Sequence, residues 1–193
     1  MKKTKFLLFI LLIQSICYSQ SPPIEWQKTF GGSNDDRANN IIQTTDGGYI
    51  ATGYTESSDG DITNNQGLHD IWVVKLNSTG DIQWQKTFGG SGYEQGNEIL
   101  QTIEGGYILT GWTASNNGNI STNYGGTDFW VIKLDPNGSL EWEKNFGGTG
   151  ADFGVSIKQT SEGGFIIGGG TQSNDIDLSG DPRFYADFWV VKL

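Results

Sequence analysis

Short, largely apolar stretches of this chain are separated by clusters rich in glycine, asparagine and aspartate. Residues 49–55 and 71–76 are rich in aromatic and β-branched side chains, as β-strands are. Asp46-Gly47-Gly48 lies between two such stretches and suits a hairpin turn, because glycine accepts a positive φ. No segment keeps a 3.6-residue apolar period with helix caps. The pattern therefore predicts short antiparallel strands and a protein nearly free of helix.

The pattern returns three times at a constant interval. A sequence that runs from Trp through Lys and Phe to Gly-Gly begins at Trp26, Trp84 and Trp142, so that 84 − 26 = 58 and 142 − 84 = 58. The Gly-Gly turn and the stretch that ends in Lys-Leu also recur. Each unit contains four expected strands, which in the first unit span about 26–30, 39–44, 49–55 and 71–76.

A four-stranded unit that repeats without helices is typical of a β-propeller blade, whose two apolar faces are covered by neighbouring blades. We therefore expect an all-β fold of β-propeller-type, four-stranded antiparallel blades in three repeats of about 58 residues. The expected repeat boundaries are 24–81, 82–139 and 140–193.

Three blades are fewer than the roughly four to eight that usually close a ring. We therefore expect either a fragment of a longer propeller or a propeller completed by a homodimer. The repeat order also suggests that the strand at Trp26 completes the blade that ends at Leu193.

The first residues have the pattern of a secretory signal peptide at 1–19. Three lysines precede an apolar run at 6–13, and small or polar residues follow it. The run is shorter than the roughly 20 residues that span a bilayer, so we expect no transmembrane segment. A lipid anchor at Cys17 is the alternative to cleavage after Ser19. The protein is expected to be secreted or held on the outer cell surface.

Processing would leave residues 20–193, which contain neither cysteine nor methionine. Disulfides, thiolate metal sites and a cysteine nucleophile are therefore excluded for the processed chain. The whole sequence has 12 Lys+Arg and 22 Asp+Glu, a net charge of −10. Loss of three leader lysines changes the charge to −10 − 3 = −13. A surface this acidic repels phosphate backbones, so no nucleic-acid partner is expected.

Two sets of motifs resemble a known class of proteins. The segment 75–84, Lys-Leu-Asn-Ser-Thr-Gly-Asp-Ile-Gln-Trp, resembles the tryptophan motif of quinoprotein-type propellers. The Phe-Gly-Gly and Asp-Gly-Gly-Tyr motifs resemble repeats of secreted bacterial β-propeller proteins, many of which use the type IX secretion route. The resemblance covers about residues 24–193. It implies a scaffold fold and no shared catalytic site.

Two acidic loops have the alternating oxygen side chains that wrap a hard cation such as Ca²⁺. In the middle repeat Asn117 and Asn119 stand at the corresponding positions, and Asx-turns in a solvated loop are the alternative interpretation. We expect no other cofactor. The candidate calcium ligands are Asp59, Asp61, Asp175 and Asp177.

Another set of carboxylates recurs every 58 residues, at Asp36, Glu94 and Asp152. A ring of acids resembles a glycosidase pair, but an acid present once in every repeat is better explained as a local cap on backbone N–H groups. Catalytic residues should instead break the repeat, as Asp35 does. His69, the only histidine, has no counterpart in the other repeats, and we interpret it as a surface loop residue.

Some aromatic residues lie at or beyond the ends of the expected strands, namely Tyr54, Trp112 and Tyr124. Aromatic platforms beside Asn and Asp suit sugar rings, and packing between blades is the alternative. We expect an exported, non-enzymatic binding or scaffold module for a glycan or protein ligand. The alternative is a carbohydrate-active hydrolase that uses carboxylates of the rim loops.

Overall fold

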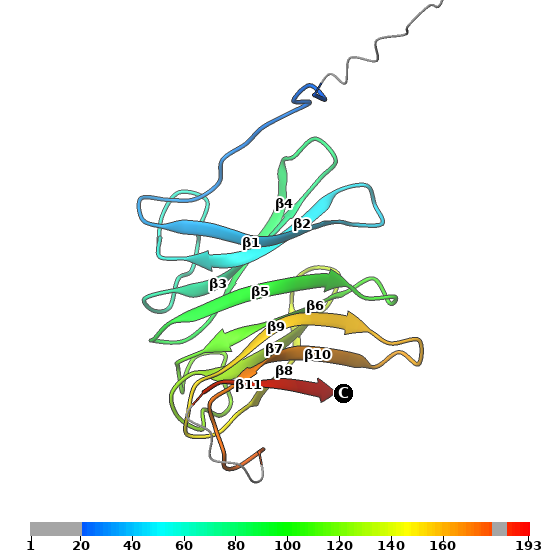
Figure 1. The fold of residues 1–193 in the computed structure, drawn as a ribbon. Helices are drawn as coiled ribbons and strands as arrows, with labels where there is room; N and C mark the ends of the chain where they lie inside the picture. Colours follow the sequence, from blue (N-terminus) through cyan, green and yellow to red (C-terminus); the bar gives the residue numbers. More distant parts are fainter. Residues whose placement is uncertain (1–20, 179–184) are drawn as a thin grey trace, which may run out of the picture.

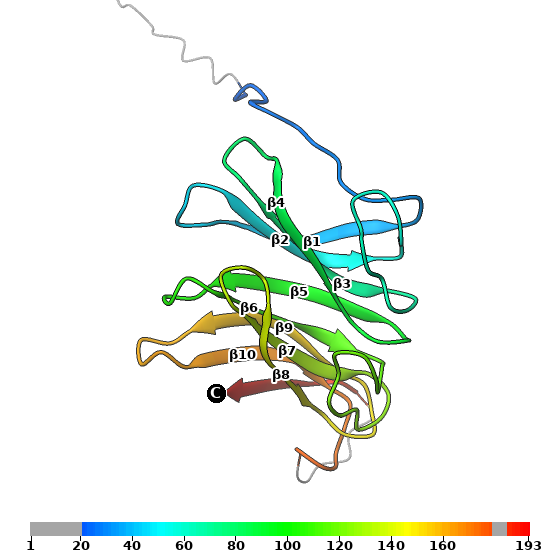
Figure 2. The ribbon, with the colours of Figure 1, turned by 180° about the vertical axis from the view of Figure 1, so that it is seen from behind.

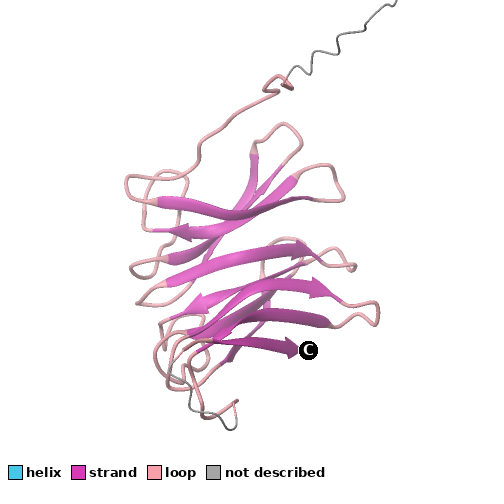
Figure 3. Ribbon diagram, viewed as in Figure 1, coloured by secondary structure: helices cyan, strands magenta, loops and turns pink. Residues whose placement is uncertain are grey.

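The computed structural model describes residues 21–178 and 185–193 (Figure 1). The expected signal peptide at 1–19, with Cys17, lies outside the described residues. The described chain is all-β and contains no helix (Figure 3), as the aromatic and β-branched stretches predict. None of its segments is therefore a helix that could cross a membrane.

Eleven strands form three antiparallel sheets, and within each sheet the strands lie side by side in chain order. The first sheet contains β1 (Asp36–Gln43), β2 (Tyr49–Thr55), β3 (Asp70–Leu76) and β4 (Ile82–Phe88). The middle sheet contains β5 (Glu94–Gln101), β6 (Tyr107–Thr113), β7 (Asp128–Leu134) and β8 (Leu140–Phe146). The third sheet contains β9 (Asp152–Gln159), β10 (Phe165–Thr171) and β11 (Asp187–Lys192).

The three sheets follow one another in an open stack, with the middle sheet between the other two (Figures 1 and 2). Apolar side chains fill both junctions. Ile50 and Val73 of the first sheet share one buried cluster with Trp130 of the middle sheet. Phe129 of the middle sheet shares another with Ile167 of the third sheet. The middle sheet is therefore covered on both faces.

Side chains also reach from sheet to sheet and fix how each sheet sits on the next. Gln101 Oε1 accepts a hydrogen bond from the backbone N–H of Thr45 at 2.8 Å, across the first junction. Gln159 Oε1 accepts one from Ile103 at 2.9 Å, across the second. The same geometry is thus used at both junctions, by residues 58 positions apart.

Hairpin turns connect the strands as the glycine pattern predicts. In the turn between β1 and β2, Gly47 has a φ of 80° and its N–H donates to the carbonyl oxygen of Thr44 at 2.9 Å. The equivalent glycines of the other two sheets, Gly105 and Gly163, also have positive φ, at 91° and 89°. A residue with a Cβ would be strained at this position.

Two sequence-based expectations about the N-terminal segment are wrong. Residues 26–30 do not form a strand, and no strand of the described residues pairs with them. The segment also does not complete the sheet that contains β11, because it lies against the first sheet, at the opposite end of the stack (Figure 1). Trp26 packs there against Tyr49, with ring centroids 5.7 Å apart.

Candidate functional site

Six side chains that differ from their repeat counterparts meet at one edge of the stack. They lie where β1, β3 and β5 begin and where β2 ends. Antiparallel pairing brings the ends of β1, β2 and β3 together, and an isolated bridge between His69 and Tyr93 adds the start of β5. We call this group the rim cluster. Its members are Asp35, Arg37, Tyr54, Glu56, His69 and Tyr93.

Three rings in contact form the centre of the rim cluster. The ring of Tyr54 lies parallel to that of His69, with centroids 4.7 Å apart. The ring of His69 meets that of Tyr93 edge-on, also at 4.7 Å. His69 and Tyr93 additionally form a β-bridge, so the rings join the first sheet to the middle sheet. Tyr54 is buried, whereas Tyr93 is 45% exposed and faces solvent.

Charged groups flank the rings. Arg37 Nη2 lies 2.6 Å from Asp35 Oδ2, which also accepts a hydrogen bond from the Tyr54 hydroxyl at 3.0 Å. These hydrogen bonds, that of Arg37 first, lower the pKa of Asp35, whereas burial raises the pKa of Tyr54. On the other side, His69 Nε2 lies 2.8 Å from Glu56 Oε1. Asp35 is therefore ionised and hydrogen-bonded at neutral pH.

The rim cluster exists only at the first sheet, since the repeat does not preserve its residues. Arg37 corresponds to Gln95, and Glu56 corresponds to Ala114. Asp35 and His69 were recognisable from the sequence as residues that break the repeat. Arg37 and Glu56 were missed, although the comparison of residues 58 positions apart would have marked them.

Of the three aromatic residues expected to bind a ligand, only Tyr54 lies in the rim cluster. Trp112 is half-buried on β6, in register with Gln95 and Phe129. Tyr124 lies in the loop that follows β6, and its backbone N–H donates to Asp128 Oδ2 at 2.6 Å. The ring contacts of the described residues do not join Tyr54 to either of them.

The candidate calcium ligands accept hydrogen bonds from the backbone of the Gly-Gly loops. Asp59 accepts from Ser33 N at 2.8 Å, and Asn117, its counterpart, accepts from Ser91 N at the same distance. The position thus uses an oxygen acceptor with or without charge. Among the described residues, no three acidic, His or Cys side chains form a metal-binding group, and the calcium hypothesis stays a prediction. Asp61, Asp175 and Asp177 make equivalent bonds to Gly31 N, Thr149 N and Gly147 N.

The carboxylates that recur in every repeat are caps on the same loops, as expected. Asp36 Oδ2 accepts a hydrogen bond from Gly32 N at 2.8 Å. Glu94 accepts one from Gly90 N and Asp152 accepts one from Gly148 N, both at 2.9 Å. Each carboxylate therefore holds a tight loop to the start of a strand, which explains why it recurs.

Two further carboxylates, Asp70 and Asp128, are fully buried where the sheets meet. Asp70 Oδ2 accepts a hydrogen bond from Gln66 N at 2.8 Å, and Oδ1 is buried without a partner. Burial is the main cause that raises the pKa of Asp70 to about 6, and the charge of Glu94 adds to it. Burial also raises the pKa of Asp128 to about 6.

These buried carboxylates should make stability depend on pH. A carboxyl whose pKa is higher in the folded state stabilises the fold below its unfolded pKa, near 3.9, and this contribution is lost as pH rises through about 6. We expect Asp70→Asn to raise the free energy of unfolding at pH 7.5 by roughly 2 kcal/mol, and by much less at pH 4.5. The measurement is urea unfolding at both values.

The matched control is Asp59→Asn, since Asn117 already occupies the equivalent position. It keeps the hydrogen bond to Ser33 N and should leave the pH dependence unchanged. If the stability of Asp70→Asn depended on pH as that of the original chain does, burial of ionised Asp70 would not be the cause of the pH dependence.

The pKa of Asp35 differs from that of a glycosidase acid. A glycosidase needs a carboxylic acid of raised pKa beside the substrate. Asp35 in the rim cluster has a lowered pKa, and the carboxyls with raised pKa, Asp70 and Asp128, are fully buried. An exposed ring between charged hydrogen-bonding groups is instead what a ligand platform requires.

The comparisons with protein families and with curated proteins found no match for this chain. The functional argument therefore depends on the residues of the rim cluster. Next to it lies a polar hollow lined by residues 29–32 and by Asn34, Asp35, Asp36 and Asp61. The hollow extends the surface that a ligand on Tyr93 would meet.

Proposed function

We propose that this chain is an exported, non-enzymatic binding module of the β-propeller class, with its three sheets as blades. The signal-peptide pattern at 1–19 supports export to the cell surface or beyond. The Phe-Gly-Gly and Asp-Gly-Gly-Tyr motifs support a relationship to secreted bacterial propeller repeats, among which type IX secretion is common. The succession of antiparallel sheets in chain order supports the blade assignment.

A glycan is the ligand class that the rim cluster favours over a protein surface. The observation that supports a glycan is the exposed ring of Tyr93, which meets the ring of His69 edge-on, in a cluster whose other rings contact charged groups. Sugar rings stack their apolar faces on aromatic rings, and their hydroxyls hydrogen-bond to carboxylates and guanidinium groups. Asp35, Arg37 and Glu56 supply both kinds of polar partner.

Affinity electrophoresis through gels that contain soluble polysaccharides tests this proposal. We expect retention by at least one polysaccharide and a loss of affinity of about tenfold or more for Tyr93→Ala and for Arg37→Ala. Gln95→Ala is the matched control, because Gln95 holds the position of Arg37 on the middle sheet. Absence of retention on every gel, or equal retention of all variants, would contradict it.

The second candidate function is a carbohydrate-active hydrolase. One observation favours it, namely the two carboxylates, Asp35 and Glu56, that flank the Tyr54–His69 stack. An enzyme should release reducing ends from a polysaccharide and lose that turnover in Asp35→Asn. A binding module should be retained and show no turnover at all.

A further inference from the structure

The outer face of the third sheet has the side chains of a buried junction, but no other strand of the described residues packs on it. We call this face the tail. Ile166, Phe188 and Val190 lie on it and are 42%, 85% and 50% exposed. Their equivalents in the other two sheets are all fully buried: Ile50, Ile71 and Val73 in the first, and Ile108, Phe129 and Val131 in the middle sheet.

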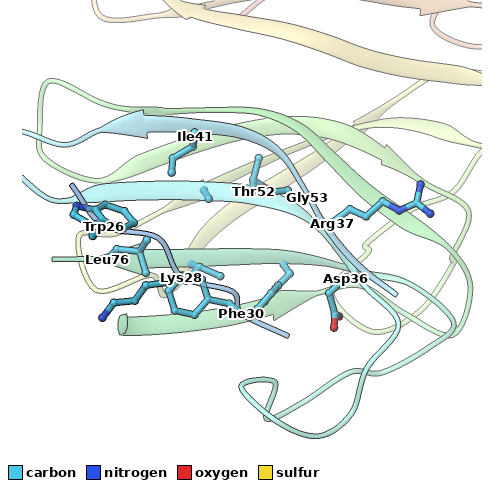
Figure 4. Close-up of a pocket in the computed structure, with 13 residues that line it drawn as sticks. Trp26, Lys28, Phe30, Asp36, Arg37, Ile41, Thr52, Gly53 and Leu76 are labelled. Atoms are coloured by element: carbon cyan, nitrogen blue, oxygen red, sulfur yellow. The ribbon is translucent and has the colours of Figure 1, made fainter. Parts of the chain in front are cut away.

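The outer face of the first sheet, which we call the head, is only partly covered. Trp72, Val74 and Leu76 are buried there and Phe30 packs against them, but the part of the head on β1 is open. Ile41 is 55% exposed there, whereas its equivalents Ile99 and Ile157 are fully buried by the preceding sheet. A pocket of about 270 Å³ opens on the head, between Ile41 and the segment that carries Trp26 and Phe30 (Figure 4).

The segment 24–30 occupies the place of a fourth strand that belongs to a preceding sheet. In the middle sheet, Gly138 lies against the ring of Trp84, which is carried by β4 of the sheet before it. In the first sheet, Gly80 lies against the ring of Trp26 in the same way. The third sheet has three strands, so β11 has a free edge where β3 and β7 pair with a fourth strand.

Side-chain size at the centre of each junction indicates that the head fits the tail. At the first junction, Gly96 lies so close to Thr52 that a Cβ on it would meet Thr52 Oγ1 at 2.3 Å. At the second, Gly154 and Thr110 repeat this pair, at 2.0 Å. On the uncovered faces the sizes are reversed. The head carries Ala38 where the other sheets have glycine, and the tail carries Gly168 where they have threonine.

Charge also matches between the head and the tail. In the middle sheet Lys133 Nζ lies 2.8 Å from Glu141, and in the first sheet Lys75 Nζ donates to Gln83 Oε1 at the same distance. The equivalent lysine of the third sheet, Lys192, is exposed on β11. The residue equivalent to Gln83 and Glu141 is Glu25, in the segment 24–30.

We infer that the tail of one copy binds the head of a second copy, and that residues 24–30 of the second copy pair with β11 of the first. The third sheet then gains the fourth strand that the other sheets have, and the new junction repeats the internal ones. Head-to-tail contacts form a closed ring when the rotation from one copy to the next adds up to a full turn. Two copies supply 2 × 3 = 6 sheets, which is within the roughly four to eight blades of closed propellers.

Light scattering coupled to size-exclusion chromatography tests this inference on the full chain, expressed for export and purified. We expect twice the mass of one chain. Phe188→Asp and Ile41→Asp place a charge in the new junction and should each raise the dimer dissociation constant at least about a hundredfold. Ile103→Asp is the control, because Ile103 is 87% exposed in a turn outside both faces and should leave the dimer intact.

A size exchange tests the head-to-tail geometry itself. Gly168→Thr should weaken the dimer, because threonine would meet the methyl group of Ala38. Addition of Ala38→Gly should restore it, since Thr–Gly is the pair used at both internal junctions. A double variant no tighter than Gly168→Thr alone would overturn this geometry.

Cysteine pairs test the added strand in a Cys17→Ser background. Val73 pairs with Lys86 and Val131 pairs with Lys144, so Val190 should pair with Lys28 of the second copy. Lys28→Cys with Val190→Cys should form an interchain disulfide on oxidation. Gln27→Cys with Val190→Cys is out of register and should not. A monomer at all concentrations, a mass above the dimer, or equal crosslinking of both pairs would overturn the inference.

Discussion

Replacement of Trp130 with alanine is expected to lower the free energy of unfolding by about 4 kcal/mol. Trp130 is fully buried on β7, within the apolar cluster that joins the first sheet to the middle sheet. Its indole Nε1 also donates a hydrogen bond to Glu143 Oε2 at 2.7 Å. The variant loses that bond and leaves a cavity between two sheets. Since a domain of this kind is stable by only about 5–15 kcal/mol, much of the total is lost.

Urea unfolding followed by circular dichroism measures this effect. The measurement uses the Phe188→Asp background, so that association of chains does not contribute to stability. Trp142→Ala is the control, because Trp142 on β8 is 37% exposed and its removal should cost about 1 kcal/mol or less. Equal losses in the two variants would show that the junction between the sheets is not the main source of stability.

Gly154→Ala is expected to cost about 3 kcal/mol, although it adds a single methyl group. A Cβ on Gly154 would lie 2.0 Å from Thr110 Oγ1 and 2.3 Å from Phe129 Cε2. Phe129 is fully buried between the middle and third sheets and has no space to move away. The two sheets must therefore separate at this point, which weakens the contacts around it.

The control for Gly154→Ala lies on the next strand of the same sheet. A Cβ on Gly168 meets only Phe188 Cζ, at 3.9 Å, so Gly168→Ala should change stability by less than about 1 kcal/mol. Both variants are measured in the Phe188→Asp background by urea unfolding. A small effect at Gly154 would mean that the third sheet is not held tightly against the middle one.

The sequence predicts the strands well where each strand depends on its own residues and on a neighbour close in the chain. The expected strand at 49–55 matches β2, and the expected strand at 71–76 differs from β3 only by the addition of Asp70. The segment 26–30 has an equally strong strand pattern and stays irregular. A strand needs a partner edge, and the edge that corresponds to the partners of β4 and β8, on β11, lies at the far end of the stack (Figure 1).

The rim cluster is less predictable from the sequence, because the fold assembles it from four strand ends. Tyr54 is recognisable as an aromatic residue outside the repeated core pattern. Arg37 and Glu56 lie in polar stretches without any local signal. The register of β1 and β2 brings Arg37 beside Tyr54, and the register of β2 and β3 brings Glu56 beside His69. Trp112 has the same aromatic signal as Tyr54, but it lies half-buried on the middle sheet.

The pairing of every strand with neighbours in chain order has a consequence for how the protein is made. Paired strands are separated by few residues, so little chain entropy is lost when they meet. Each sheet can therefore form as soon as its own residues are available, without waiting for the rest of the chain. Export from the N-terminus would therefore build the stack one sheet at a time. Residues 24–30 would leave the translocation channel first and yet reach their final pairing last, when a complete second chain presents the edge of β11.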